Sequence, residues 1–167
     1  MKKAVLFIAA ISMSFYAVAQ DTYVTSAGVA LKSNNLDEAK QDIDKAMSNA
    51  ETSTKPKALL LKAEIYFSLM KVEKYKSSNP YREGADAIFR LVELKPNYEK
   101  STVDQFLGLS AFLYYNDGAR AYNDKKLNDA SDFMKKVIKI HDMKRFAMLP
   151  ATQLKQYDTI AADAKQT

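Results

Sequence analysis

The residue types that most often carry out chemistry are few in this chain and stand far apart. His141 is the only histidine, and it follows the last apolar turn of a helix-like segment. A histidine in that place usually interacts with the final carbonyl groups and the dipole of its helix, so a role as base or metal ligand would need partners that the sequence does not identify. Cysteine is absent, which excludes disulfides, thiolate metal sites, a cysteine nucleophile and a lipid-bearing cysteine.

Carboxylates gather in one short segment, where they could suggest an acid–base pair or a hard metal ion. The segment mixes four acids with two lysines: Asp37, Glu38, Lys40, Asp42, Asp44 and Lys45. Alternation of the two signs is typical of a solvated helix face, and we favour that interpretation. No calcium loop, phosphate-binding glycine loop, nucleophile elbow or zinc-protease motif occurs. We therefore expect no enzyme, no metal and no cofactor.

Composition indicates which elements must carry whatever function the chain has. Its 167 residues suffice for one domain with a hydrophobic core, and only four glycines and four prolines are present, which favours long helices. The formal charge of +5 falls to +3 without residues 1–19, since 23 basic residues then face 20 acidic ones. A weak positive charge spread along the chain does not indicate nucleic-acid binding. The expected fold class is all-α.

The first nineteen residues follow the plan of a secretory signal peptide. Lys2 and Lys3 precede an apolar run, and Ala17-Val18-Ala19 supplies small residues before Gln20, where cleavage is expected. The alternative is an uncleaved anchor, but the run from Ala4 to Ala19 is 16 residues long, shorter than the roughly 20 of a membrane-spanning helix. The segment resembles signals of Gram-negative, Bacteroidetes-like bacteria. We expect an exported chain with no membrane span after cleavage, periplasmic in the first place and secreted or on the cell surface in the second.

One pattern of apolar and small residues occurs three times. Small residues at the same place in each copy, Ala39, Gly84 and Ala130, are 45 and 46 residues apart. Each copy spaces its apolar residues as one face of a helix: Leu36, Ala39, Ile43, Ala46 and Met47; Tyr81, Gly84, Ile88, Leu91 and Val92; Leu127, Ala130, Met134, Val137 and Ile138. A second helix-like segment precedes each copy. The repeating unit is thus a pair of helices, as in an α-solenoid.

This pattern resembles the tetratricopeptide repeat family. The third copy matches the motif through Tyr114, Gly118, Ala121, Leu127 and Ala130. The first copy matches through Tyr23, Ala27, Ala30, Leu36, Ala39 and Ala46. The second copy matches only in its back half. The resemblance implies repeats near 21–54, 66–99 and 112–145 in a single domain over 20–167. It also implies that Ala27, Ala39, Gly84, Gly118 and Ala130 are the close-packing positions.

The period of 45–46 residues exceeds the 34 of that family by about eleven. We expect the extra residues to lengthen the first helix of the second and third repeats at its N-terminal end by about three turns. A different helical-repeat family with a longer unit is the alternative. Residues 146–167 would then form either a capping helix or the start of a fourth repeat.

The family usually binds a peptide or a partner helix along a concave groove lined by the first helix of each repeat. The positions matching that groove are Tyr115, Tyr122, Leu69, Glu73, Lys76 and Val24. The Lys/Asn clamp that some relatives use for a C-terminal carboxylate is not reproduced. The sequence therefore predicts a non-catalytic interaction scaffold of the bacterial envelope with a protein or peptide partner. The alternative is a carrier of a small molecule, peptide or glycan that uses the aromatic residues.

Overall fold

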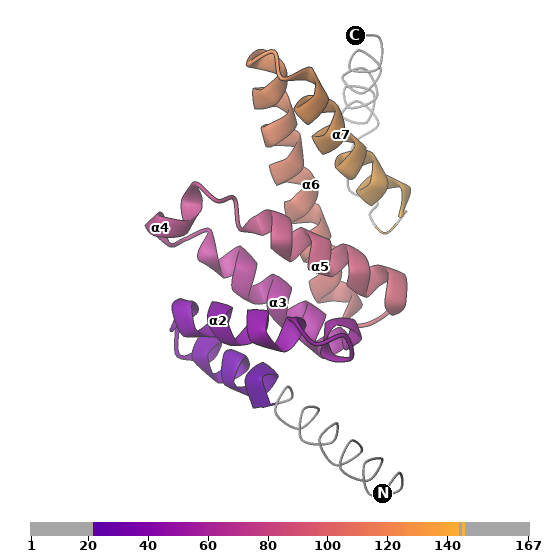
Figure 1. Ribbon diagram of the computed structural model, residues 1–167. Coiled ribbons are helices and arrows are strands. Elements are labelled where there is room, and N and C mark those ends of the chain that lie inside the picture. The colour runs from indigo at the N-terminus through magenta and orange to yellow at the C-terminus, as the bar shows by residue number, and fades with distance from the viewer. Residues whose placement is uncertain (1–21, 144, 146–167) are drawn as a thin grey trace, which may run out of the picture. The chain divides into compact units, whose positions relative to one another are not determined.

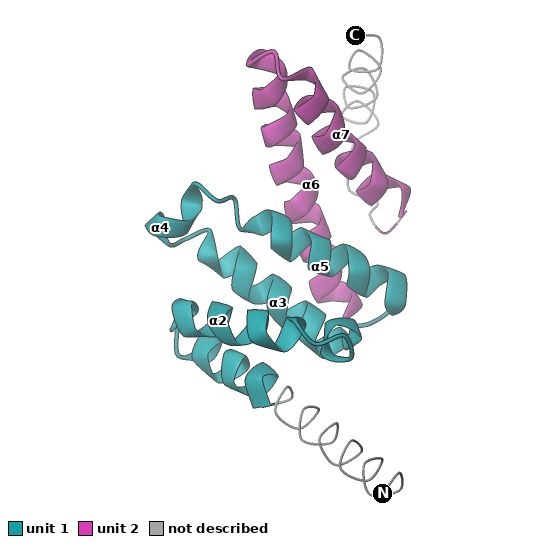
Figure 2. Cartoon of the chain, in the orientation of Figure 1, with its two compact units in different colours: residues 1–98 teal, residues 99–167 magenta. Residues whose placement is uncertain are grey.

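A computed structural model describes residues 22–143 and 145, and every regular element in that part of the chain is helical. The all-α expectation is therefore correct for the described residues. The expected signal peptide, its cleavage site before Gln20 and the choice between a cap and a fourth repeat lie outside them. The chain divides into two compact units, residues 1–98 and 99–167 (Figure 2).

Unit 1 contains a helix over 22–32 and then α2 (Leu36–Met47), which lies against it through an apolar stripe. Ala39, Ile43 and Ala46 of α2 are fully buried, and they share a core with Ala27 of the preceding helix. Their spacing of three and four residues places these side chains on one face. Asp37 and Glu38 in the first turn and Lys45 in the last turn complement the helix dipole.

The rest of unit 1 is a 3₁₀ turn, η1 (Thr52–Thr54), followed by α3 (Pro56–Leu69), the short α4 (Glu73–Lys76) and α5 (Tyr81–Leu94). Helices α3 and α5 pack closely on one another, and α2 packs on α3 (Figure 1). Pro56 stands in the first turn of α3, where its missing N–H costs nothing. Helix α3 begins at Pro56, where the N-terminal extension was expected, but it has only 14 residues and ends at Leu69, within the region of the motif, so the expected long helix is not present.

Unit 2 contains α6 (Lys100–Asn123) and α7 (Leu127–Asp142), which pack on each other along much of their length (Figure 1). Helix α6 has 24 residues, so here the first helix of the pair is long, as expected. Tyr114, fully buried, stacks on Phe133 of α7 with ring centroids 6.2 Å apart. Arg145, which follows α7, donates a hydrogen bond of 2.6 Å to Asp104 of α6.

Close helix contacts coincide with the small residues of the repeat. Ala27, Ala39 and Ala130 have no exposed surface. A Cβ atom on Gly84 would lie 3.0 Å from the ring of Phe67, and one on Gly118 would lie 2.5 Å from the end of Met134. Each of these glycines therefore lets two helices approach where a larger residue would push them apart.

The turn between the two helices of a pair also repeats. Asn34, Asn79 and Lys125 adopt left-handed backbone conformations, with φ of 56°, 49° and 60°. They are 45 and 46 residues apart, and each stands five residues before the small residue of its copy. In the first and third turns the next residue donates its N–H to a carbonyl five residues back at 2.8 Å, the same helix-ending bond in both. The period seen in the sequence is thus present in the backbone.

Candidate functional site

Two of the four groove positions predicted in unit 1 are buried. Leu69 is fully buried and Val24 is 8% exposed, and both belong to the hydrophobic core of unit 1. The motif assigns Leu69 to the groove face because it continues the first helix of the second repeat beyond the point where α3 ends. The Leu69 side chain, at the end of α3, lies in the core. Neither Leu69 nor Val24 therefore offers surface to a partner.

Glu73 and Lys76 lie in α4, where both side chains are exposed. They form an ion pair with each other, three residues apart. An exposed pair of this kind contributes little to stability, so both groups remain accessible to solvent and to a partner. They lie on a four-residue helix, and not on the long helix that the repeat motif predicted.

Tyr115 and Tyr122 are on α6, with Tyr115 partly buried and Tyr122 44% exposed. Two large apolar residues are exposed nearby on the same helix, Leu109 by 41% and Phe112 by 62%. All lie on the side away from the buried residues that pack on α7, and we call the surface formed by Gln105, Gly108, Leu109, Phe112, Tyr115, Asn116, Ala119 and Tyr122 the outer face of α6.

This outer face lacks charge to an unusual degree for a solvent-facing helix surface. The twelve residues 105–116 contain no acid and no base, although charged residues make up 27% of the chain. An exposed helix face normally carries charged groups, whereas exposed apolar side chains gathered in one place mark interaction surfaces. The outer face of α6 is therefore the strongest candidate for a binding surface among the described residues.

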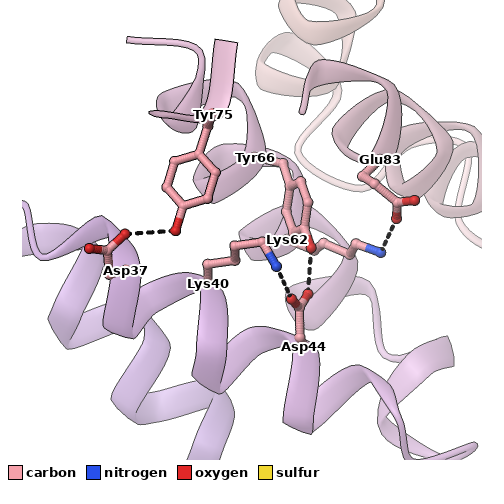
Figure 3. A network of polar contacts seen from close by, with 7 residues as sticks. All are labelled: Asp37, Lys40, Asp44, Lys62, Tyr66, Tyr75 and Glu83. Atoms are coloured by element: carbon pink, nitrogen blue, oxygen red, sulfur yellow. Dashed lines mark hydrogen bonds and ion pairs between the residues drawn. The ribbon is translucent and has the colours of Figure 1, made fainter. Parts of the chain in front are cut away.

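A network of polar contacts in unit 1 joins α2, α3 and α5 (Figure 3). Its centre is Tyr66 on α3, which is 7% exposed and donates a hydrogen bond of 2.6 Å to Asp44 of α2. Lys40 forms an ion pair of 2.6 Å with the same carboxylate, and Lys62 pairs with Glu83 of α5 at 2.8 Å. The two ammonium groups lie 5.5 and 5.2 Å from the Tyr66 ring centre.

Burial of the Tyr66 hydroxyl and its hydrogen bond to Asp44 raise the pKa of this phenol well above its usual range, so it stays protonated. The protonated Tyr66 hydroxyl can only donate its proton to Asp44, and Lys40 and Lys62 lie over its ring. The network thus holds three helices in register, and its groups are engaged with one another.

A second part of the network attaches α4 to α2. The Asp37 carboxylate accepts hydrogen bonds from Lys74 at 2.6 Å and from the Tyr75 hydroxyl at 2.7 Å. The hydrogen bond from Lys74, followed by that from Tyr75, lowers the pKa of Asp37. The bond to Asp37 raises the pKa of both donors. These contacts link segments 37 and 38 residues apart in the sequence.

Two open depressions lie beside Asp37. One, of about 560 Å³, is lined by Asp37, Lys40, Gln41, Asp44, Lys45, Ser48 and Tyr75. The other, of about 510 Å³, is lined by Leu31, Asn34, Asn35, Leu36, Asp37, Ser68, Lys71 and Val72. Both are mixed in character, and the carboxylates and tyrosine of the first are engaged in the contacts just described. The first depression could hold a polar ligand at these groups only if they exchanged partners.

The remaining candidates for chemistry occupy ordinary places. His141 is exposed in the last turn of α7, with Nδ1 3.2 Å from Asp142. Of the acidic segment, Asp42 accepts a hydrogen bond of 2.5 Å from Ser26, and Glu38 accepts one of 2.6 Å from Asn35. Among the described residues, no three potential ligands are grouped to hold a metal ion.

Comparison with family models, with curated proteins and with solved structures finds no match to this chain. Within the part of the chain that the structure describes, no helix combines the length and the apolar character needed to cross a membrane. The functional interpretation therefore depends on the surfaces and contacts above.

Sequence reasoning missed two features of the site. It did not include Leu109 or Phe112 in the groove, although the uncharged run 105–116 is visible in the sequence. It also interpreted the acidic segment as a solvated face, whereas Asp37 and Asp44 bind side chains from other helices. No local signal could have shown those pairings, because the partners stand 22 or more residues away.

Proposed function

We propose that the chain is a non-catalytic interaction scaffold that binds a polypeptide partner along the outer face of α6. The observation that supports this most directly is Phe112, which is 62% exposed in the middle of an uncharged helix surface. A large aromatic ring left in water gains most when a partner covers it, and such residues dominate binding energy in protein interfaces. Tyr115 and Tyr122 extend the same surface toward the end of the helix.

The architecture supports this function in a second way. Helix pairs with small residues at their contacts and with turns at a constant spacing suit a tetratricopeptide-like α-solenoid, which presents extended surfaces and not enclosed cavities. In such a scaffold a peptide or a helix of the partner would lie along the long first helix of a pair, here α6. The fold alone does not decide the function, and the exposed aromatic and apolar groups carry the proposal.

The proposed place of action is the bacterial envelope. It depends on residues 1–19, whose basic start, apolar run and small residues before Gln20 have the plan of a cleaved export signal. The mass and N-terminal sequence of the chain recovered from its producing cells test this part. A chain beginning at Gln20 in the periplasmic or secreted fraction would support export, and an intact N-terminus in the cytoplasmic fraction would contradict it.

A photo-crosslinking amino acid at position 112 tests the binding surface directly. The full chain carrying it is expressed in its producing cells, irradiated and recovered, and the attached polypeptide is identified by mass spectrometry. The matched control places the same amino acid at Asp132, an exposed position on α7 with 71% of its side chain accessible. One recurrent polypeptide attached at 112 and absent at 132 is the expected result. Equal or no attachment at the two positions would contradict the proposal.

The second candidate function is a carrier of a small polar molecule or glycan. The depression of about 560 Å³ beside Asp37 and Tyr75 favours it, since its volume falls within the range of ligand pockets. Substitution Tyr75→Ala distinguishes the two functions. It would abolish uptake of a small ligand by the depression and would leave crosslinking at position 112 unchanged.

A further inference from the structure

We propose that the polypeptide bound on the outer face of α6 is α6 of a second copy of this chain, packed antiparallel to form a twofold dimer. This inference rests on the proposed function, since it names the partner of that same surface. A twofold interface requires one patch that is complementary to itself, so that residue i contacts residue j and j contacts i. The outer face of α6 meets this requirement in shape, in charge and in area.

The shape is self-complementary about the level of Ser110. Gly108 lies on the outer face, and a Cβ atom added to it would meet nothing within 4 Å, so the helix backbone is open there. Phe112 projects from the same face one turn further on. In an antiparallel pair centred at Ser110, the Phe112 ring of each copy lies over Gly108 of the other. The same centre places Gln105 opposite Tyr115, and Ser101 opposite Ala119.

The charge distribution limits what can cover this face. A partner that brought charged groups onto residues 105–116 would have to remove them from water with nothing of opposite sign to meet them. The antiparallel copy brings the same uncharged residues instead. Of the charged residues of α6 near the face, Arg120 is 72% exposed at its margin, and Asp104 is paired with Lys100 and Arg145.

The area is sufficient for a weak dimer. A large side chain exposes on the order of 200 Å² when fully accessible, so Leu109 and Phe112 together expose roughly 200 Å² at their fractions of 41% and 62%. With the partly exposed residues beside them, pairing two copies would bury at most about 1,000 Å² in total, at the lower limit for a specific interface. We therefore expect weak, reversible association.

Disulfide crosslinking tests the pairing, because the native chain has no cysteine. In the full chain, Leu109→Cys places one thiol within a turn of the twofold axis, and Asp132→Cys places one on exposed α7 as the matched control. Under mild oxidation at micromolar concentration, Leu109→Cys is expected to form a covalent dimer at least about 10-fold faster than Asp132→Cys. Equal rates would overturn the pairing.

Sedimentation velocity over a concentration series supplies a second measurement. Phe112→Lys is expected to weaken self-association about 100-fold, because the change enters the twofold interface twice. Val29→Lys is its control, since Val29 is an equally exposed apolar residue (60%) on the first helix of unit 1. The native chain, Phe112→Lys and Val29→Lys all carry the apolar segment 4–19, so any association through that segment would affect the three equally. Association unaffected by Phe112→Lys, or a native chain that stays monomeric, would overturn the dimer.

The two proposals fail differently. If the native chain is monomeric but the photo-crosslinker at position 112 captures a different polypeptide, the dimer is wrong and the scaffold function stands. If position 112 captures nothing and the chain is monomeric, both are wrong. Crosslinking of position 112 to a second copy, together with the Leu109→Cys dimer, would support both.

Discussion

Substitution of Gly84 by alanine is predicted to destabilise unit 1, whereas the same change at Gly28 is predicted to stabilise it. Both glycines lie within helices of unit 1, so both changes affect the same unfolding transition. Alanine in place of glycine in a helix interior contributes about 0.5–1 kcal/mol through lower backbone entropy and better helix propensity. The two sites differ in what the new methyl group would meet.

At Gly28 the nearest atom to the added Cβ is Cδ2 of Leu61 at 3.8 Å, an ordinary contact, so the full gain is expected. At Gly84 the Cβ would lie 3.0 and 3.1 Å from two ring atoms of Phe67 and 3.4 Å from the backbone oxygen of Ala63. The Phe67 ring is only 7% exposed and the carbonyl is part of α3, so neither can move freely. Overpacking of this kind costs about 1–3 kcal/mol, which leaves a net loss of about 1 kcal/mol.

Urea unfolding followed by far-ultraviolet circular dichroism measures the difference. With a slope of about 1.5 kcal/mol per molar, the two midpoints should differ by about 1 M. If Gly84→Ala raised the midpoint of unit 1 as much as Gly28→Ala does, the close approach of α3 and α5 at this glycine would be refuted.

Four further predictions test the polar contacts. Tyr66→Phe removes a buried hydrogen bond and should cost about 1–2 kcal/mol in urea unfolding of unit 1. Asp37 has a lowered pKa, so its contribution is present above the unfolded pKa and is lost as pH falls through the folded pKa; NMR titration should give a carboxyl midpoint below that of an unfolded peptide. Burial raises the pKa of Glu64, so its stabilising effect is confined to low pH and is lost as pH rises through the folded pKa, and Glu64→Gln should flatten that part of the stability profile. Arg145→Met should destabilise unit 2 by about 1–2 kcal/mol, because Asp104 would keep only its exposed lysine partner.

The helix pairs and their period could be predicted from the sequence because they depend on local spacing. Apolar residues three and four apart define the buried face of α2, and the same spacing defines those of α5 and α7. The left-handed turns at Asn34, Asn79 and Lys125 follow the same 45–46-residue period. Local side-chain size and helix geometry suffice for these features.

The error over the second repeat has a specific origin. The chain leaves the helix after Leu69 and re-enters one at Glu73, yet the residues between, Met70, Lys71 and Val72, include neither glycine nor proline. Propensity therefore gives no stop signal there, and tertiary contacts decide the break. Tyr75 hydrogen-bonds to Asp37 on α2, which holds α4 out of line with α3. A contact across 38 residues is not visible in a repeat motif.

Two sets of aromatic residues differ in what lies over their rings, and this difference supports the proposed surface. Tyr23, Tyr66, Tyr75 and Tyr114 each have a lysine ammonium about 5 Å from the ring centre. At Tyr23, Tyr66 and Tyr114 a lysine comes from a neighbouring helix, so these contacts help to hold helix pairs together. Phe112 and Tyr122, in the described part of the chain, have no cation over them and remain exposed. A ring that one of the chain's own lysines covers already has a cation–π partner. An exposed ring on an uncharged helix surface is stabilised when a second protein surface removes it from water. The distinction separates aromatic residues that pair with the chain's own lysines from those that we propose to bind a partner.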